Sequence, residues 1–138
     1  MYNALIMQWT VNTIEELPLV VTEVVDILES GKEEDGAIIL ALHGDLGAGK
    51  TTFMQEMGRQ LGIEEMIVSP TFIVMKEYQT KSARYPSLIH MDAYRIEDID
   101  EMRVLHFTEL LQQKKTIICV EWAERIIDIL PTHTYHLN

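Results

Sequence analysis

The chain is poor in cysteine and in positive charge, and each shortage excludes a class of protein. With a single cysteine, Cys119, no disulfide can form within the chain. Because Cys119 lies in the apolar run Ile117–Val120, we expect a buried, unreactive thiol rather than a catalytic one. Lysine and arginine number 11 against 22 aspartate and glutamate, which gives a net charge of −11. Nucleic-acid backbones are bound by clustered cations, so the chain is not expected to grip one by itself.

Long hydrophobic runs and linker-like segments are also absent. The longest uninterrupted apolar run, Ala37–Leu42, has six residues, whereas a membrane-spanning helix needs about 20. The first residues have neither the basic start nor the long apolar core of a secretory signal. Internal repeats, low-complexity tracts and Pro/Gly/Ser-rich linkers are missing. We therefore expect one cytoplasmic domain over residues 1–138, with one core and no membrane association.

Hydrophobic spacing predicts helices that alternate with strands. Apolar residues recur every three or four positions from Thr13 to Glu29, which is the helical period. Pro18 does not fit beyond a first turn, so the helix is expected to begin nearer Glu16 or Leu17. The other predicted elements are strands over residues 4–11, 37–42, 73–79, 87–94, 116–120 and from 135 onward, and helices over 50–61, 96–113 (one or two) and 123–130. This alternation predicts an α/β fold of three layers, a mostly parallel central sheet flanked by helices.

A glycine-rich motif follows the apolar run Ala37–Leu42. Residues 44–51 fit the pattern G-x-x-x-x-G-K-[ST] at every fixed position. In this pattern the glycines let backbone N–H groups point at phosphate oxygens, and the following helix adds the positive end of its dipole. Lys50 is expected to reach the β- and γ-phosphates, and the Thr51 hydroxyl to bind Mg²⁺. The residues expected to bind nucleotide are Gly44, Asp45, Leu46, Gly47, Ala48, Gly49, Lys50, Thr51 and Thr52.

The strand before this motif and the amphipathic helix after it favour a phosphate loop over a plain glycine-rich turn. The fold is therefore predicted to be P-loop NTPase-like.

A Mg²⁺ ion at such a loop needs an acid at the end of a neighbouring strand. Glu121 ends the apolar strand 116–120, and Asp92 ends the run 88–91. Open α/β sheets bind ligands beyond the carboxyl ends of their strands, where both acids emerge if these strands run parallel to the first. Either acid could instead cap a helix or lie in a solvated loop. We expect Lys50, Asp92 and Glu121 to form the catalytic set, with both acids at the metal and Trp122 near the nucleotide.

Two further features are open to more than one interpretation. Ser69-Pro70-Thr71-Phe72 fits a loop whose two hydroxyls sense the γ-phosphate and its metal, and it fits a plain turn equally well. The histidines show no metal-ligand spacing, so no zinc site is expected. They are His43, His90, His106, His133 and His136.

In this order the motifs resemble the TsaE family, small bacterial P-loop ATPases required for the threonylcarbamoyl modification of adenosine 37 in tRNA. A generic nucleotide kinase lacks the motifs that follow the phosphate loop. The resemblance covers roughly residues 12 to 131. The matching stretches are residues 44–52, residues 69–72 with the strand through Tyr78, His90-Met-Asp-Ala-Tyr-Arg95, and Val120-Glu-Trp122 followed by Glu124 and Leu130-Pro131.

The resemblance implies ATP and Mg²⁺ as cofactors, with Thr51 and Glu121 as metal ligands and Asp92 as the second essential acid. It implies a switch-like loop that includes Ser69 and Thr71, and it makes Thr13 the best match to a Ser or Thr near the base. It also implies weak ATP hydrolysis by the chain alone and action on a complex of TsaB and TsaD, in which TsaD performs the transfer to tRNA. The acidic charge agrees, since the partners would then make most of the tRNA contacts.

The chain departs from the family pattern in two places. After Arg95 the usual Asp-Pro-Glu-Glu-Leu is replaced by Glu97–Met102, which leaves the partner-facing geometry of that segment open. Family members also usually continue through a further C-terminal strand, so the chain is short or cut relative to them.

Two other functions remain as alternatives. One is a small-molecule P-loop kinase, in which Arg84, Arg95 and Arg103 could serve as lid arginines, although no acceptor signature accompanies them. The other is a nucleotide-dependent scaffold that binds ATP without useful turnover.

Overall fold

Six strands form one sheet in the order β1-β6-β2-β5-β4-β3. The computed structural model describes residues 8–9, 12–31, 36–43, 47–67, 75–94, 96–98, 100–104, 106–131 and 133–137. The strands are β1 (Gln8–Trp9), β2 (Ile38–Leu42), β3 (Met75–Gln79), β4 (Ser87–Asp92), β5 (Thr116–Glu121) and β6 (Tyr135–Leu137). All neighbouring strands pair in parallel except β3, which runs antiparallel to β4.

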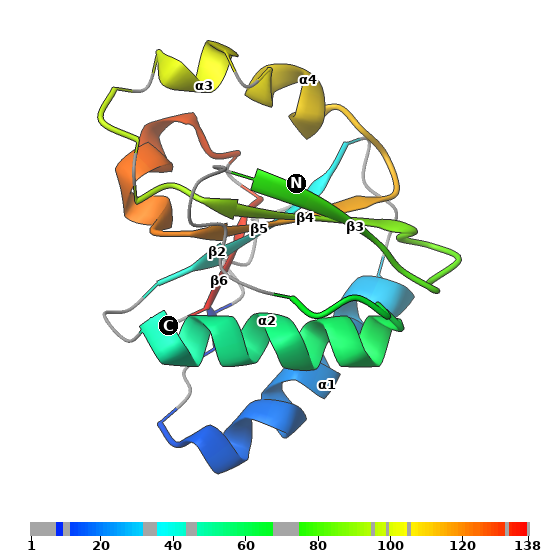
Figure 1. The fold of residues 1–138 in the computed structure, drawn as a ribbon. Helices are drawn as coiled ribbons and strands as arrows, with labels where there is room; N and C mark the ends of the chain where they lie inside the picture. Colours follow the sequence, from blue (N-terminus) through cyan, green and yellow to red (C-terminus); the bar gives the residue numbers. More distant parts are fainter. Residues whose placement is uncertain are drawn as a thin grey trace, which may run out of the picture.

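Helices cover both faces of this sheet (Figure 1). The 3₁₀ turn η1 (Ile14–Glu16) leads into α1 (Leu17–Ser30), which lies with α2 (Gly47–Leu61) below the sheet in the view of Figure 1. The short helices α3 (Glu101–Val104) and α4 (Phe107–Leu111) lie above it. The 3₁₀ helix η2 (Ala123–Ile129) packs on that same face, since Ala123 and Ile126 share a buried cluster with Phe107. The three layers confirm the predicted α/β fold with a mostly parallel sheet.

Strands β2 and β5 form the buried centre of the sheet. Every residue of both strands is buried, as the uncharged runs 37–42 and 116–120 predict for strands covered on two faces. Alternate residues enter two separate clusters, so that Leu40 packs toward α1 and α2 while Ile39 packs toward α3, α4 and η2. Glu121 is the one ionisable carboxylate of β5, and it stands at the carboxyl end of the strand.

Helix α1 begins at Leu17 with Pro18 in its first turn, as the sequence predicts. Its buried residues recur at helical spacing and face α2 and the sheet; they are Leu17, Val21, Val24 and Leu28. Among the described residues, no helix combines the length and apolarity required to cross a lipid bilayer.

Some element boundaries differ from the sequence prediction. Helix α2 begins at Gly47, inside the glycine-rich motif, rather than near Lys50. The predicted helix 123–130 is a 3₁₀ helix interrupted at Ile126, whose φ of −127° is not helical. Ile126 is fully buried in the cluster on the face of the sheet that α3 and α4 cover. The segment 96–113 contains two short helices, within the prediction of one or two.

Candidate functional site

The carboxyl ends of three parallel strands meet at one edge of the sheet. Glu121, the last residue of β5, pairs with Leu42 at the end of β2 and with Asp92 at the end of β4. Paired residues of neighbouring parallel strands project to the same face. Leu42 belongs to the cluster that packs against α1 and α2. The structure therefore brings the two predicted acids together on the face that α2 covers.

Lys50 is buried at this edge and has no anionic partner among the residues that the structure describes. It lies in the first turns of α2, is 5% exposed, and its Nζ atom makes no hydrogen bond. The nearest compensation is the ring of Trp122, whose centroid lies 4.0 Å from Nζ. A cation over an aromatic face gains about 0.5–2 kcal/mol, which is less than the effective cost of several kcal/mol for burying an ion. The ammonium is thus placed where an anionic ligand would stabilise it.

Trp122 turns the chain from β5 into η2. Its φ of 58° lies in the left-handed region, which costs a residue with a Cβ about 1–2 kcal/mol. The turn brings its half-buried ring beneath Lys50 and leaves it 5.0 Å, between centroids, from the ring of Tyr94. The Arg125 guanidinium lies 5.2 Å from the centroid of Tyr94 in turn. A predicted nucleotide-site residue is therefore in direct contact with the predicted phosphate-binding lysine.

Glu121 is hydrogen-bonded to His90, which the sequence analysis placed in a family motif without assigning it a role. Its Oε2 atom lies 2.5 Å from Nε2 of His90, and the two side chains are 4% and 0% exposed. The other ring nitrogen of His90, Nδ1, is buried and has no hydrogen-bond partner in the described part of the chain. His90 precedes Asp92 by two residues on β4, so strand alternation alone places it on the face of the two acids. That alternation was the available signal.

Comparison with known proteins establishes the family. A family model described as "Threonylcarbamoyl adenosine biosynthesis protein TsaE" matches residues 11–138. The chain belongs to the TsaE family. This finding agrees with the resemblance drawn from the phosphate loop and the motifs that follow it.

Three curated relatives carry the name "tRNA threonylcarbamoyladenosine biosynthesis protein TsaE". The protein of Nostoc sp. is 43% identical over 93 residues, which is 66% of this chain and 55% of the relative. That of Synechocystis sp. is 38% identical over 122 residues, 86% of this chain and 64% of the relative. That of Bacillus subtilis is 43% identical over 93 residues, 67% of this chain and 55% of the relative. The matches thus span 55% to 64% of these relatives' own lengths.

Asp92, which belongs to a TsaE-family motif, both caps a turn and lies beside Glu121. Its Oδ1 atom accepts a hydrogen bond of 2.9 Å from the backbone N–H of Tyr94, so it caps the turn after β4. Its backbone also pairs with Glu121, and the Ala93 N–H donates to the Glu121 carbonyl at 2.9 Å. The turn therefore fixes the Asp92 carboxylate beside the end of β5.

The remaining predicted site residues divide into described and undescribed ones. Gly47, Ala48 and Gly49 form the start of α2, and Thr51 and Thr52 follow Lys50 there, half-buried. Thr13 is exposed before α1, where its N–H and carbonyl both bond to Glu16. This arrangement supports a role for Thr13 at the start of the helix. The predicted residues outside the described ranges are Gly44, Asp45, Leu46, Ser69 and Thr71.

A pair of histidines, His43 and His136, lies at the same sheet edge. His43, which directly follows β2, has its Nε2 atom 2.8 Å from Nδ1 of His136 and its Nδ1 atom 3.4 Å from a carboxylate oxygen of Glu124. Burial, and then the neighbouring His43, lower the pKa of His136. No group of three or more His, Cys, Asp or Glu side chains suited to a metal occurs in the described part of the chain.

Cys119 is fully buried, which confirms the prediction of a buried thiol. Burial raises the pKa of the thiol, and the Glu121 carboxylate on the same strand face raises it further. The thiolate form needed for nucleophilic chemistry is therefore strongly disfavoured.

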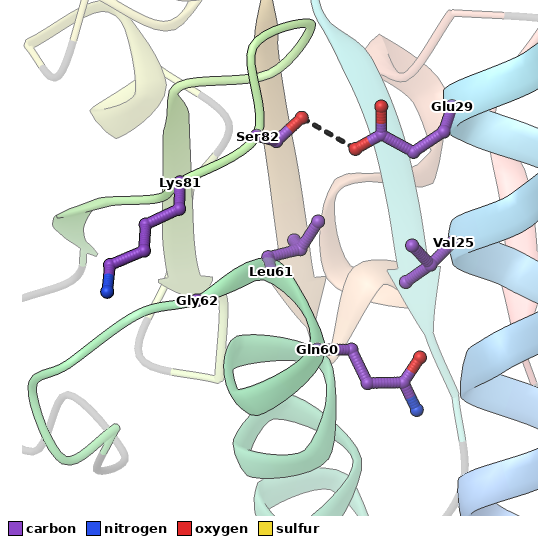
Figure 2. Close-up of a pocket in the computed structure, with 7 residues that line it drawn as sticks. All are labelled: Val25, Glu29, Gln60, Leu61, Gly62, Lys81 and Ser82. Atoms are coloured by element: carbon purple, nitrogen blue, oxygen red, sulfur yellow. Dashed lines mark hydrogen bonds between the residues drawn. The ribbon is translucent and has the colours of Figure 1, made fainter.

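A pocket of about 170 Å³ lies at the other end of α2 (Figure 2). It lies between the ends of α1 and α2 and the turn after β3, where Ser82 donates a 2.6 Å hydrogen bond to Glu29. Its residue Leu61 is eleven positions from Lys50, or roughly 16 Å along the helix axis at 1.5 Å per residue. This pocket is separate from the edge that carries the predicted site.

Proposed function

We propose that the chain is a Mg²⁺-dependent ATP-binding protein that hydrolyses ATP slowly and supports threonylcarbamoylation of adenosine in tRNA by acting on a TsaB–TsaD complex. The observation that carries the nucleotide part is the buried, unpartnered ammonium of Lys50 at the edge where Glu121 and Asp92 meet. Membership of the TsaE family carries the tRNA part. The names of the relatives in Nostoc, Synechocystis and Bacillus subtilis support it.

The residues around Lys50 fit a polyphosphate. Helix α2 has 15 residues and begins at Gly47, so the positive end of its dipole lies at the motif. A helix N-terminus that follows a glycine-rich loop is a common site for phosphate groups. Lys50 would move its ammonium from the Trp122 ring to phosphate oxygens, which offer charge-assisted hydrogen bonds in place of a cation–π contact. The ligand would thereby neutralise a charge that the free protein leaves buried.

The donor set fits Mg²⁺. The ion prefers oxygen ligands and is usually held by one or two carboxylates together with substrate phosphates. Glu121 and Asp92 supply two carboxylates on paired residues, and the Thr51 hydroxyl follows Lys50 in α2. Bound Mg²⁺ would supply charge neutralisation on the phosphates during transfer.

The chain's own residues would then bind and orient the nucleotide. Lys50 would hold the phosphates, and the backbone of residues 47–49 would present N–H groups to them. Trp122 and Asp92 would border the site from the ends of β5 and β4. In P-loop hydrolases a partner that supplies a missing transition-state group changes the rate by about 10³–10⁵-fold. A chain that binds and orients ATP, while its partners supply a missing transition-state group, would hydrolyse ATP slowly by itself.

The contacts of the candidate lid arginines argue against the kinase alternative. Arg84 donates a 2.6 Å hydrogen bond to the Glu29 carbonyl and a second one to that of Gly31, so it caps the end of α1. Arg103 is exposed and lies 3.9 Å from Asp100, between charged atoms. Arg95 lies outside the described residues. Arg84 and Arg103 are therefore engaged in local contacts rather than arranged over the phosphate motif.

Measurement of labelled ATP products with and without TsaB and TsaD tests the proposal. We expect slow release of free phosphate by the chain alone and an increase of at least about tenfold with both partners, a modest bound against the range for partner-supplied groups. A phosphorylated acceptor would favour the kinase, and ATP binding without product would favour the scaffold. Turnover of about 10 s⁻¹ with no response to partners would contradict the proposal.

A further inference from the structure

The side chain of His90 is fully buried, and its Nε2 atom is within hydrogen-bond distance of the Glu121 carboxylate. We propose that His90 is a positioning residue, which donates a hydrogen bond from Nε2 to Oε2 of Glu121 and so holds this carboxylate in the orientation that binds Mg²⁺. This inference rests on the proposed function, because it assigns a role toward the metal of that site.

The strand register makes this contact specific. His90 pairs with Cys119 and Asp92 pairs with Glu121, so the imidazole reaches one step diagonally across two parallel strands. All four side chains project to the face covered by α2. The backbones of β4 and β5 fix the separation between His90 and Glu121, and the 2.5 Å contact then selects one orientation of the glutamate side chain.

The chemistry of the pair decides which atom donates. An ionised carboxylate only accepts hydrogen bonds, so the Nε2 atom of His90 carries the proton in this contact. Hydrogen bonds to ionised groups are short and strong. Carboxylates that hold metals are commonly oriented by such outer partners, and loss of the partner typically lowers metal affinity by about 10–100-fold.

A purely structural role does not account for His90. An imidazole inside an apolar face leaves its Nδ1 atom buried without a partner, and such an atom costs stability that an aliphatic side chain would not. What the imidazole provides and an aliphatic residue lacks is the donor to Glu121. Because His90 is inaccessible, it acts through the carboxylate and not on the nucleotide.

Two polar substitutions separate the donor from the mere presence of a polar group. In His90→Gln the side-chain amide nitrogen can reach the place of Nε2, so the bond to Glu121 can be kept. In His90→Asn the shorter amide ends near the place of Nδ1 and cannot reach Glu121. His90→Leu removes both nitrogen atoms and provides the aliphatic comparison. Circular dichroism and thermal melting of the full chain establish that each variant is folded.

The measurement is ATP affinity in Mg²⁺ and in EDTA, by isothermal titration calorimetry. Formation of Mg-ATP in solution is common to all variants, so the ratio of the two affinities compares their metal sites. We expect the ratio to fall about 10–100-fold in His90→Leu and His90→Asn, to stay within about threefold of the unmodified chain in His90→Gln, and the EDTA affinity to be unchanged throughout.

Three results would overturn the inference. One is an unchanged ratio in His90→Leu, and another is an equal loss of affinity in Mg²⁺ and EDTA, which would make His90 structural. The third is a loss in His90→Gln as large as in His90→Asn, since a donor at Nε2 should suffice. If the unmodified chain itself binds ATP without any effect of Mg²⁺, the proposed function fails at that point, and this inference fails with it before any variant is compared.

Discussion

Replacing Lys50 by methionine should stabilise the free protein while it destroys ATP binding. The side chain is 5% exposed and its ammonium has no hydrogen-bond partner, so in the absence of a ligand the charge is buried without compensation beyond the Trp122 ring. Methionine keeps an unbranched stem of similar reach and a similar helix propensity, and it removes the charge. The two effects are expected to have opposite signs because the same ammonium that costs stability serves the ligand.

The magnitudes follow from these contacts. An unsatisfied buried polar group costs about 1–3 kcal/mol, and more when it is charged, while the lost cation–π contact gives back about 0.5–2 kcal/mol. The balance is a gain of about 1 kcal/mol, which raises the Tm of a domain of this size by about 3–5 °C. Loss of two charge-assisted hydrogen bonds of about 1.5–3 kcal/mol each weakens ATP binding by roughly 10²–10⁴-fold.

Thermal melting without nucleotide and calorimetric titration with Mg-ATP check the two signs. Arg59→Met on the same helix is the matched control, because Arg59 is exposed and pairs with Glu56, so ATP affinity should not change. Lys50→Ala should lose ATP binding as well, but it also removes the buried stem and should not gain stability. Unchanged affinity in Lys50→Met would show that the phosphate motif is not the site. A Tm lowered by several degrees would refute the view that the ammonium is uncompensated in the free protein.

Other perturbations test the acids and the histidine pair. Glu121→Ala should retain ATP binding in EDTA but lose most Mg²⁺-dependent hydrolysis, measured as released phosphate; full hydrolysis in this variant would remove Glu121 from the metal. Asp92→Ala should still bind TsaB and TsaD in a pull-down, with or without tRNA, but fail to support the modification. If this binding required tRNA, it would contradict the expectation that the partners make most of the tRNA contacts. Burial and then His43 lower the pKa of His136 from 6.5. As the pH falls below about 6.5, the unfolded chain therefore binds a proton more readily than the folded chain does, and the free energy of unfolding should decrease. In His136→Asn, whose amide can still meet His43, the difference in Tm between pH 7.5 and pH 5.5 should shrink; an unchanged difference would assign the acid sensitivity to other groups.

Much of the layer structure could be predicted because its signals are local. Helix α1 is encoded by apolar residues at helical spacing, and β2 and β5 by short uncharged runs. Parallel strands bring their carboxyl ends to one edge, so the adjacency of Asp92 and Glu121 also followed from the sequence. The start of α2 at Gly47 and the 3₁₀ character of η2, with its non-helical φ at Ile126, did not follow from these local signals.

The contacts that give the site its chemistry were less accessible to sequence reasoning. The bond between His90 and Glu121 joins residues 31 positions apart, and it depends on a register that no local pattern fixes. The contact between Lys50 and Trp122 likewise depends on the left-handed turn after β5. Such a conformation is unusual for a bulky residue, and nothing in the neighbouring sequence indicates it. Motif spacing could identify these side chains but not which of them touch.

Buried polar atoms without partners and an unfavourable backbone conformation help to locate the functional site of this chain. Among the described residues, Tyr78 and Arg84 also bury a polar atom without a hydrogen-bond partner, but Tyr78 lies on β3 and Arg84 in the turn between β3 and β4. At the ends of β4 and β5, by contrast, an unpaired ammonium, a half-satisfied imidazole and a tryptophan in the left-handed region occur together. Each is expected to lower stability by itself, and replacing Lys50 by methionine is expected to restore part of that stability. A ligand with phosphate groups and a divalent cation would relieve the charge of Lys50 and use the carboxylate that His90 holds, so the costs converge on one bound state.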